Sequence, residues 1–216
     1  MDREGNFRVD NNSSVYFDVK YLHECYSSCL LDEDDIYLES YLNAYKELCK
    51  LMGSFFSFIE TEINSKSAIL TDLIGNDENG NFSTVKSMMR HEMDSGLLKK
   101  SGYVSGCRTL LRLHRGLDFI RQFLKHVYEL RSDEGTSSVC MKVYSKTLGN
   151  FHPWLIRQGA YLAMYTLPSR AALLNRVCGD SVEISLAILP EMLEIADEVY
   201  SRTEVCFRTN NLSNLP

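Results

Sequence analysis

Two arginines one helical turn apart, Arg108 and Arg112, are the residues whose type and spacing most directly suggest chemistry. They share one side of a helix predicted over residues 106–130 with a small residue and two aromatics: Gly116, Phe119 and Phe123. Guanidinium groups at positions i and i+4 repel each other unless an anion lies between them. The planar guanidinium fork suits phosphate and carboxylate oxygens. The pair therefore indicates either a phosphate site or ion pairs with carboxylates of a neighbouring helix.

A second predicted helix, over residues 54–75, carries two charges within its apolar stripe. At about 100° per residue, Glu62 and Lys66 fall among the apolar side chains and not on the polar face. An i,i+4 ion pair normally occupies an exposed face, where it contributes about 0.2–0.5 kcal/mol. Burying an ion costs several kcal/mol unless polar partners satisfy it. These two charges therefore indicate either a helix-stabilising pair or a site for a polar ligand.

The third candidate is the sequence Phe151-His152-Pro153-Trp154, at the start of another predicted helix. His152 is either a ligand-binding residue or a structural histidine that caps the helix or packs in the core. Trp154 is the only tryptophan. Its side chain either packs in the core or enters a membrane–water interface, which favours an amphipathic ring.

Composition and missing motifs exclude several functional classes. The formal net charge of −6 disfavours general nucleic-acid binding, which relies on clustered Lys and Arg. No GxSxG, HExxH, phosphate-cradling glycine loop or Cys/His metal spacing is present, so we expect no catalytic residues, metal or cofactor. The chain has seven cysteines and no CxxC pair, which predicts buried, reduced thiols. Its first residues are polar, and it has no apolar run of about 20 residues. Together these features predict a cytoplasmic protein.

The elements that must position these residues are helical. Apolar residues recur every three or four positions, and the prolines all lie at or after Pro153. Helices are predicted over residues 15–31, 34–52, 54–75, 81–99, 106–130, 136–149, 153–166, 168–178 and 181–206. Pro190 is expected to kink the last helix or break it. We expect one all-α domain over residues 1–216, with residues 1–14 flexible.

Three stretches strongly resemble the glycolipid-transfer-protein superfamily: residues 105–117 (SGCRTLLRLHRGL), 151–157 (FHPWLIR) and 165–170 (YTLPSR). The similarity extends from about residue 35 to Leu215-Pro216. The resemblance implies a two-layer helical sandwich, with a polar headgroup site at the surface above a hydrophobic lipid pocket. It also implies a carrier that moves lipids between membranes and is not an enzyme.

The resemblance assigns roles to the candidate residues. Glu62 matches the acidic residue that hydrogen-bonds the sphingoid amide, and Lys66 matches a basic residue that contacts phosphate. Arg108 and Arg112 match the phosphate-binding arginines, and His152 matches the histidine that bonds the amide carbonyl. The family usually has Asp where this chain has Glu62, so the headgroup contacts can differ in detail.

Two positions favour one branch of the superfamily. Members that carry neutral glycolipids have Trp at the position of Arg112, where a sugar ring stacks, and Asn at that of Lys66. The chain is therefore more similar to the branch that binds ceramide-1-phosphate. The alternatives are a neutral glycosphingolipid carrier and a lipid sensor or adaptor that binds without transferring.

The apolar part of the site is predicted from three helices, and its candidate lining residues are Phe55, Phe58, Ile59, Phe119, Phe123 and Leu162. Trp154 and Arg157 are candidates for membrane docking, because aromatic and basic side chains favour anionic lipid surfaces. We expect a cytoplasmic monomer that contacts intracellular membranes transiently, with a phosphosphingolipid and no nucleic acid as its partner.

Overall fold

The computed structural model describes residues 16–53 and 57–216, and within these ranges every side chain except those of Ser57 and Phe58. In these ranges the chain forms nine α-helices: α1 (Val19–Ser27), α2 (Leu38–Gly53), α3 (Ser57–Gly75), α4 (Val85–Asp94), α5 (Gly106–Glu129), α6 (Ser137–Lys146), α7 (Trp154–Tyr165), α8 (Arg170–Cys178) and α9 (Val182–Thr209). Short 3-10 helices lie between them: η1 (Asp32–Asp34), η2 (Leu97–Lys99), η3 (Leu148–Phe151) and η4 (Gly179–Ser181). The all-α prediction is confirmed.

Each predicted helix corresponds to an observed one, and the differences lie at the ends and at Pro190. The helix predicted over 81–99 stops at Asp94 and resumes as η2 after Gly96, whose φ of 65° is left-handed. A break at Pro190 is excluded, because α9 continues through this residue. Pro190 is exposed, so its missing N–H removes one hydrogen bond of the helix without disturbing the packed face.

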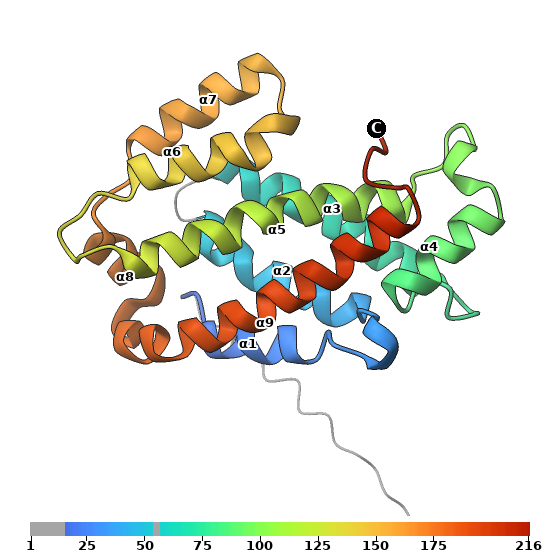
Figure 1. Ribbon diagram of the computed structural model, residues 1–216, viewed down its shortest axis with the longest axis horizontal. Helices are drawn as coiled ribbons and strands as arrows, with labels where there is room; N and C mark the ends of the chain where they lie inside the picture. Colours follow the sequence, from blue (N-terminus) through green and yellow to red (C-terminus); the bar gives the residue numbers. More distant parts are fainter. Residues whose placement is uncertain (1–15, 54–56) are drawn as a thin grey trace, which may run out of the picture.

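Five helices form a closed ring of neighbours around the core. α1 packs against α2, α2 against α3, α3 against α5, α5 against α9, and α9 against α1. Figure 1 shows α5 and α9 in front of α2 and α3, which are the two layers of the sandwich. α6 packs on α5, and α7 packs on α6 at the outer edge of the molecule (Figure 1).

The core is one hydrophobic cluster to which all nine of these helices contribute buried side chains. It includes the seven cysteines, which are buried free thiols. No helix in the described part of the chain is both long and apolar enough to cross a membrane.

The start of α5 is fixed by one buried carboxylate. Ser105 caps the helix by accepting a hydrogen bond from the Arg108 N–H at 3.2 Å. Glu92 of α4, which has no exposed area, accepts hydrogen bonds from the Ser105 hydroxyl at 2.6 Å and from the N–H groups of Gly106 at 2.6 Å and Cys107 at 3.1 Å. A negative charge at this end complements the helix dipole and satisfies N–H groups that have no partner within the helix. Glu92 therefore sets the direction in which later residues of α5 point.

Replacing Glu92 with Ala should lower the free energy of unfolding by about 3 kcal/mol, because it leaves these buried donors and the Tyr103 hydroxyl (2.8 Å from Glu92) without their acceptor. Urea denaturation followed by circular dichroism measures the change. Glu194→Ala is the matched control: Glu194 is exposed on α9, and its loss should stay within about 0.5 kcal/mol. Equal effects of the two substitutions would contradict the assignment.

Candidate functional site

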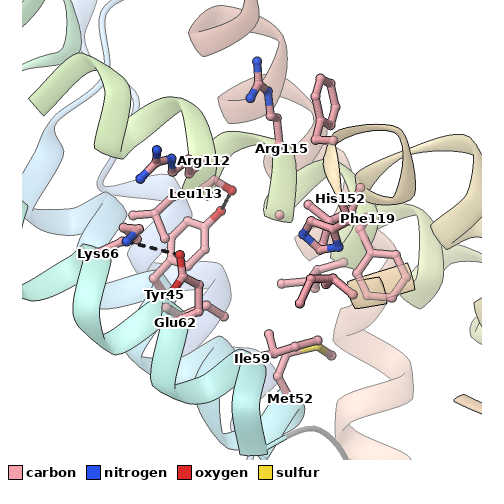
Figure 2. Close-up of a pocket in the computed structure, with 16 residues that line it drawn as sticks. Tyr45, Met52, Ile59, Glu62, Lys66, Arg112, Leu113, Arg115, Phe119 and His152 are labelled. Carbon is pink, nitrogen blue, oxygen red and sulfur yellow. Dashed lines mark hydrogen bonds and ion pairs between the residues drawn. The ribbon is translucent and has the colours of Figure 1, made fainter. Parts of the chain in front are cut away.

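A cavity of about 450 Å³ lies between α3, α5 and the junction of η3 with α7. Figure 2 shows Met52, Ile59 and Phe119 on its apolar wall. The side chains with a charge or an imidazole that line it are Glu62, Lys66, Arg112, Arg115 and His152. An apolar cavity with a few convergent polar groups is the usual form of a small-molecule site.

Glu62 and Lys66 form an ion pair on α3, with 3.1 Å between carboxylate oxygen and ammonium nitrogen. The Lys66 side chain is 14% exposed, whereas that of Glu62 is 65% exposed. The expectation that both charges lie within the buried stripe therefore holds for Lys66 and is wrong for Glu62, which lies where the stripe meets solvent. The two interpretations of this pair are compatible: it is an i,i+4 ion pair, and it lines the cavity.

Arg112 lies at the exposed edge of the same cavity. In Figure 2 its guanidinium group lies near the Lys66 ammonium group, on the side opposite His152. The two basic residues meet because α3 and α5 pack against each other.

Arg115 also lines the cavity, although its position on the helix does not single it out in the sequence. Its guanidinium carbon lies 4.0 Å from the centroid of the Phe151 ring. Burial lowers the pKa of Arg115, and repulsion from Arg112 lowers it further. Arg115 follows Arg112 by three positions, about 60° around the helix, so a search for basic residues near Arg112 would have found it.

Arg108 does not line this cavity. Its Nη2 donates a hydrogen bond to the Leu98 carbonyl at 2.5 Å, which turns the side chain toward η2. Its Nε is buried and has no hydrogen-bond partner among the described residues. Arg108 and Arg112 thus lie on one helix but face different surroundings, and a shared phosphate remains a prediction.

His152 faces the cavity with one nitrogen occupied. Its Nδ1 lies 2.7 Å from the Tyr144 hydroxyl. Burial raises the pKa of Tyr144 to about 12, so this hydroxyl keeps its proton at neutral pH and can donate it to Nδ1. When Tyr144 is the donor, the neutral His152 ring carries its hydrogen on Nε2, which can then donate to an acceptor in the cavity.

The six predicted pocket residues divide into four groups, the last of which is Leu162 alone. Ile59 and Phe119 line the cavity. Phe123 is buried behind Phe119, with the two rings stacked 5.9 Å apart. Phe55 and the side chain of Phe58 lie outside the described residues.

Leu162 differs from its expected location, since its side chain is 73% exposed. The reason is the rotation of α7, which buries Ala160 and Met164. Residues two positions before and after Leu162 lie about 200° away around a helix. Leu162 therefore belongs to the outer surface of α7.

The outer surface of α7 is apolar, and we call the set Trp154, Leu155, Leu162 and Tyr165 the α7 surface. These four side chains are between 65% and 76% exposed. Arg157 is also exposed on α7. A group of exposed large apolar side chains usually marks an interaction site. The α7 surface begins two residues after His152, next to the cavity.

Comparison with known proteins gives a consistent result. The family described as Glycolipid transfer protein matches residues 36–179. A ceramide-1-phosphate transfer protein of Danio rerio is 36% identical over 208 residues, which cover 93% of this chain and 98% of the relative.

Solved structures agree with the fold. The crystal structure of the mouse ceramide-1-phosphate transfer protein in its apo form superposes with a TM-score of 0.86 at 30% identity and covers 93% of this chain and 100% of its own. The human ceramide-1-phosphate transfer protein in complex with 12:0 ceramide-1-phosphate gives a TM-score of 0.84 at 29% identity with the same coverage of both chains.

The free energy of unfolding should decrease as the pH falls from 7.5 to 5.5. Burial lowers the pKa of His152, and the Glu62 carboxylate opposes the shift; burial also lowers the pKa of His114. Below a pH of about 6.5 the unfolded chain binds protons that these folded imidazoles resist, so folding loses stability. Urea denaturation at the two pH values should show a smaller change for His152→Gln than for the wild type. An equal change in both proteins would contradict the burial of His152.

Proposed function

Because this chain belongs to the glycolipid transfer protein family, we propose that it binds ceramide-1-phosphate and carries it between membranes without a chemical step. The cargo is supported by relatives named as ceramide-1-phosphate transfer proteins, and by the ligand in the human structure. We also propose that the protein is a cytoplasmic monomer that contacts membranes peripherally.

The observation that carries this proposal is a basic rim on an apolar cavity. Lys66, Arg112 and Arg115 line a cavity whose wall is mainly apolar. An amphiphile with an anionic headgroup fits such a site, because guanidinium and ammonium groups form strong, charge-assisted hydrogen bonds with phosphate. A neutral sugar would leave the repulsion between Arg112 and Arg115 without compensation.

The remaining polar groups suit an amide. The Glu62 carboxylate accepts the amide N–H of the lipid, while Nε2 of His152 donates to the amide carbonyl. The phosphate displaces part of the Glu62–Lys66 ion pair and binds Lys66 and Arg112. Arg108 joins the phosphate once its guanidinium leaves the Leu98 carbonyl, where it now donates a hydrogen bond.

Burial of the lipid chains in the cavity offsets the cost of removing them from the bilayer. Each buried CH₂ is worth about 0.8 kcal/mol, so a chain of about 16 carbons resists entry into water by about 13 kcal/mol. The cavity must offer comparable burial, and Ile59 and Phe119 provide part of it.

We assign membrane docking to the α7 surface together with Arg157. The exposed aromatic rings of Trp154 and Tyr165 suit the membrane–water interface. Arg157 adds attraction to anionic headgroups. Because α7 starts directly after Pro153, docking brings the cavity to the membrane.

Arg112→Leu should lower the rate of ceramide-1-phosphate transfer between vesicles by about 10- to 100-fold, the loss expected for one charge-assisted hydrogen bond. A fluorescent ceramide-1-phosphate measures transfer, and circular dichroism checks the fold. Arg90→Leu is the matched control, since Arg90 is exposed on α4 and does not line the cavity. Unchanged transfer by Arg112→Leu would rule out the phosphate role. A wild-type preference for neutral glycosphingolipids would instead support the glycolipid carrier, and binding without transfer would support the sensor or adaptor.

Trp154→Ala should slow transfer by about fivefold while leaving the amount of lipid bound, seen by native mass spectrometry, nearly unchanged. Trp154→Phe should retain most of the rate, because an aromatic side chain remains. Tyr128→Ala removes an exposed aromatic from α5, outside the α7 surface, and serves as the control. Equal losses of binding and transfer in Trp154→Ala would show that this residue is structural.

A further inference from the structure

The residues after α9 turn back along the fold. Asn211 has a left-handed φ of 57°, which reverses the chain. The Leu212 N–H then donates to the Phe207 carbonyl at 2.8 Å, and the Leu212 side chain is buried. Figure 1 shows residues 210–216 rising from the end of α9. This 210–216 segment is therefore anchored to the fold by both a backbone hydrogen bond and a buried side chain.

One carbonyl of the 210–216 segment reaches the rim of the cavity. The Ser213 carbonyl accepts a hydrogen bond from Nη2 of Arg115 at 2.9 Å. Two other charges act on Arg115, since Arg112 repels it and Glu204 attracts it. Because a charged donor makes a stronger hydrogen bond than a neutral one, the Ser213 carbonyl is suited to hold this guanidinium against both influences.

The same guanidinium supports the opposite side of the rim. It lies over the Phe151 ring, 4.0 Å from the centroid, in cation–π geometry. Phe151 is 53% exposed, so few other contacts hold its ring. The next residue is His152, whose imidazole lines the cavity. Arg115 thus joins three parts of the chain: α5, the 210–216 segment and the end of η3.

We propose that the 210–216 segment is a strap that positions the headgroup site: its Ser213 carbonyl holds Arg115 over Phe151, and this stack fixes the backbone that presents His152. Arg115 is then a positioning residue for His152. The proposal rests on the proposed lipid binding for its effect on transfer, but the placement of Phe151 and His152 does not depend on any lipid. Without the strap, Arg115 moves toward Glu204 or the lipid phosphate, and the Phe151–His152 edge loosens.

A double-mutant cycle tests this coupling. One variant ends after Leu212, which removes the Ser213 carbonyl but keeps the buried Leu212 side chain. The second variant is Arg115→Met, which keeps an apolar stem without the charge, and the third combines both changes. Arg202→Met is the matched control, since Arg202 of α9 donates to the Leu31 carbonyl at 2.8 Å away from the cavity.

Two readouts separate positioning from general stability. The first is the rate of ceramide-1-phosphate transfer between vesicles. The second is acrylamide quenching of Trp154 fluorescence in lipid-free protein; Trp154 is the only tryptophan and lies two residues after His152. Thermal unfolding verifies that each variant is folded.

Each single variant should transfer about fivefold more slowly, in line with one hydrogen bond, and the double variant should be no slower than Arg115→Met. The acrylamide quenching constant of Trp154 fluorescence should differ from the wild-type value in all three variants. In Arg202→Met it should equal the wild-type value. Additive losses of about 25-fold in the double variant, or unchanged quenching in the shortened chain, would overturn the proposal.

A further variant keeps the test decisive if the shortened chain does not fold. Phe151→Leu removes the ring that Arg115 covers, and it should change Trp154 quenching and be non-additive with Arg115→Met in the same way. Additive effects of these two substitutions would reject the strap. If the wild type transfers no ceramide-1-phosphate, the proposed function fails while the quenching cycle still tests the strap. If the wild type transfers lipid but quenching does not change in any variant, the strap alone fails.

Discussion

The carboxylate of Glu92 accepts hydrogen bonds from the first N–H groups of α5 in a place without solvent exposure. A helix start that is capped in this way cannot slide by one residue, because a shift would rotate every later side chain by about 100° and leave buried donors unpaired. The basic rim depends on this register. Arg112 and Arg115 line the cavity, and Arg108 faces η2. These directions follow from the fixed start of α5, because each side chain's angle around the helix depends on its distance from that start.

Charge at the rim contrasts with the charge of the whole chain. The formal net charge is −6, yet three basic side chains line one cavity. In the described structure, Glu62 forms an ion pair with one of the three, Lys66. Arg112 and Arg115 repel each other, and Arg115 is partly buried, where charges are screened less than in water. In the proposed function an anion bound at Arg112 would relieve this repulsion, and the site would recognise charge locally against the field of the protein.

The residues proposed for headgroup recognition and for membrane docking are separated by a very short piece of chain. His152 lines the cavity and Trp154 belongs to the α7 surface, with Pro153 between them. Proline fixes one backbone dihedral and limits the flexibility of this junction. Tyr144 holds one end of the His152 ring through its hydroxyl, and Arg115 covers the neighbouring Phe151. The proposed membrane contact of α7 would therefore act close to the residues proposed to bind the headgroup.

The sequence by itself determined the helices and part of the site, and tertiary packing decided the rest. Apolar periodicity predicted the helices. Lys66 within the apolar stripe of one helix, and Arg112 on the same side of another helix as Phe119, indicated a possible site, and both residues line the cavity. A helical pattern gives only the angle of a side chain around the axis of its helix. The packing of neighbouring helices decides what contacts the side chain at that angle. For this reason Phe123 lies behind the cavity wall and Leu162 points outward. The contact of Arg115 with Ser213 had no sequence signal at all, because its acceptor is a backbone carbonyl that every residue carries.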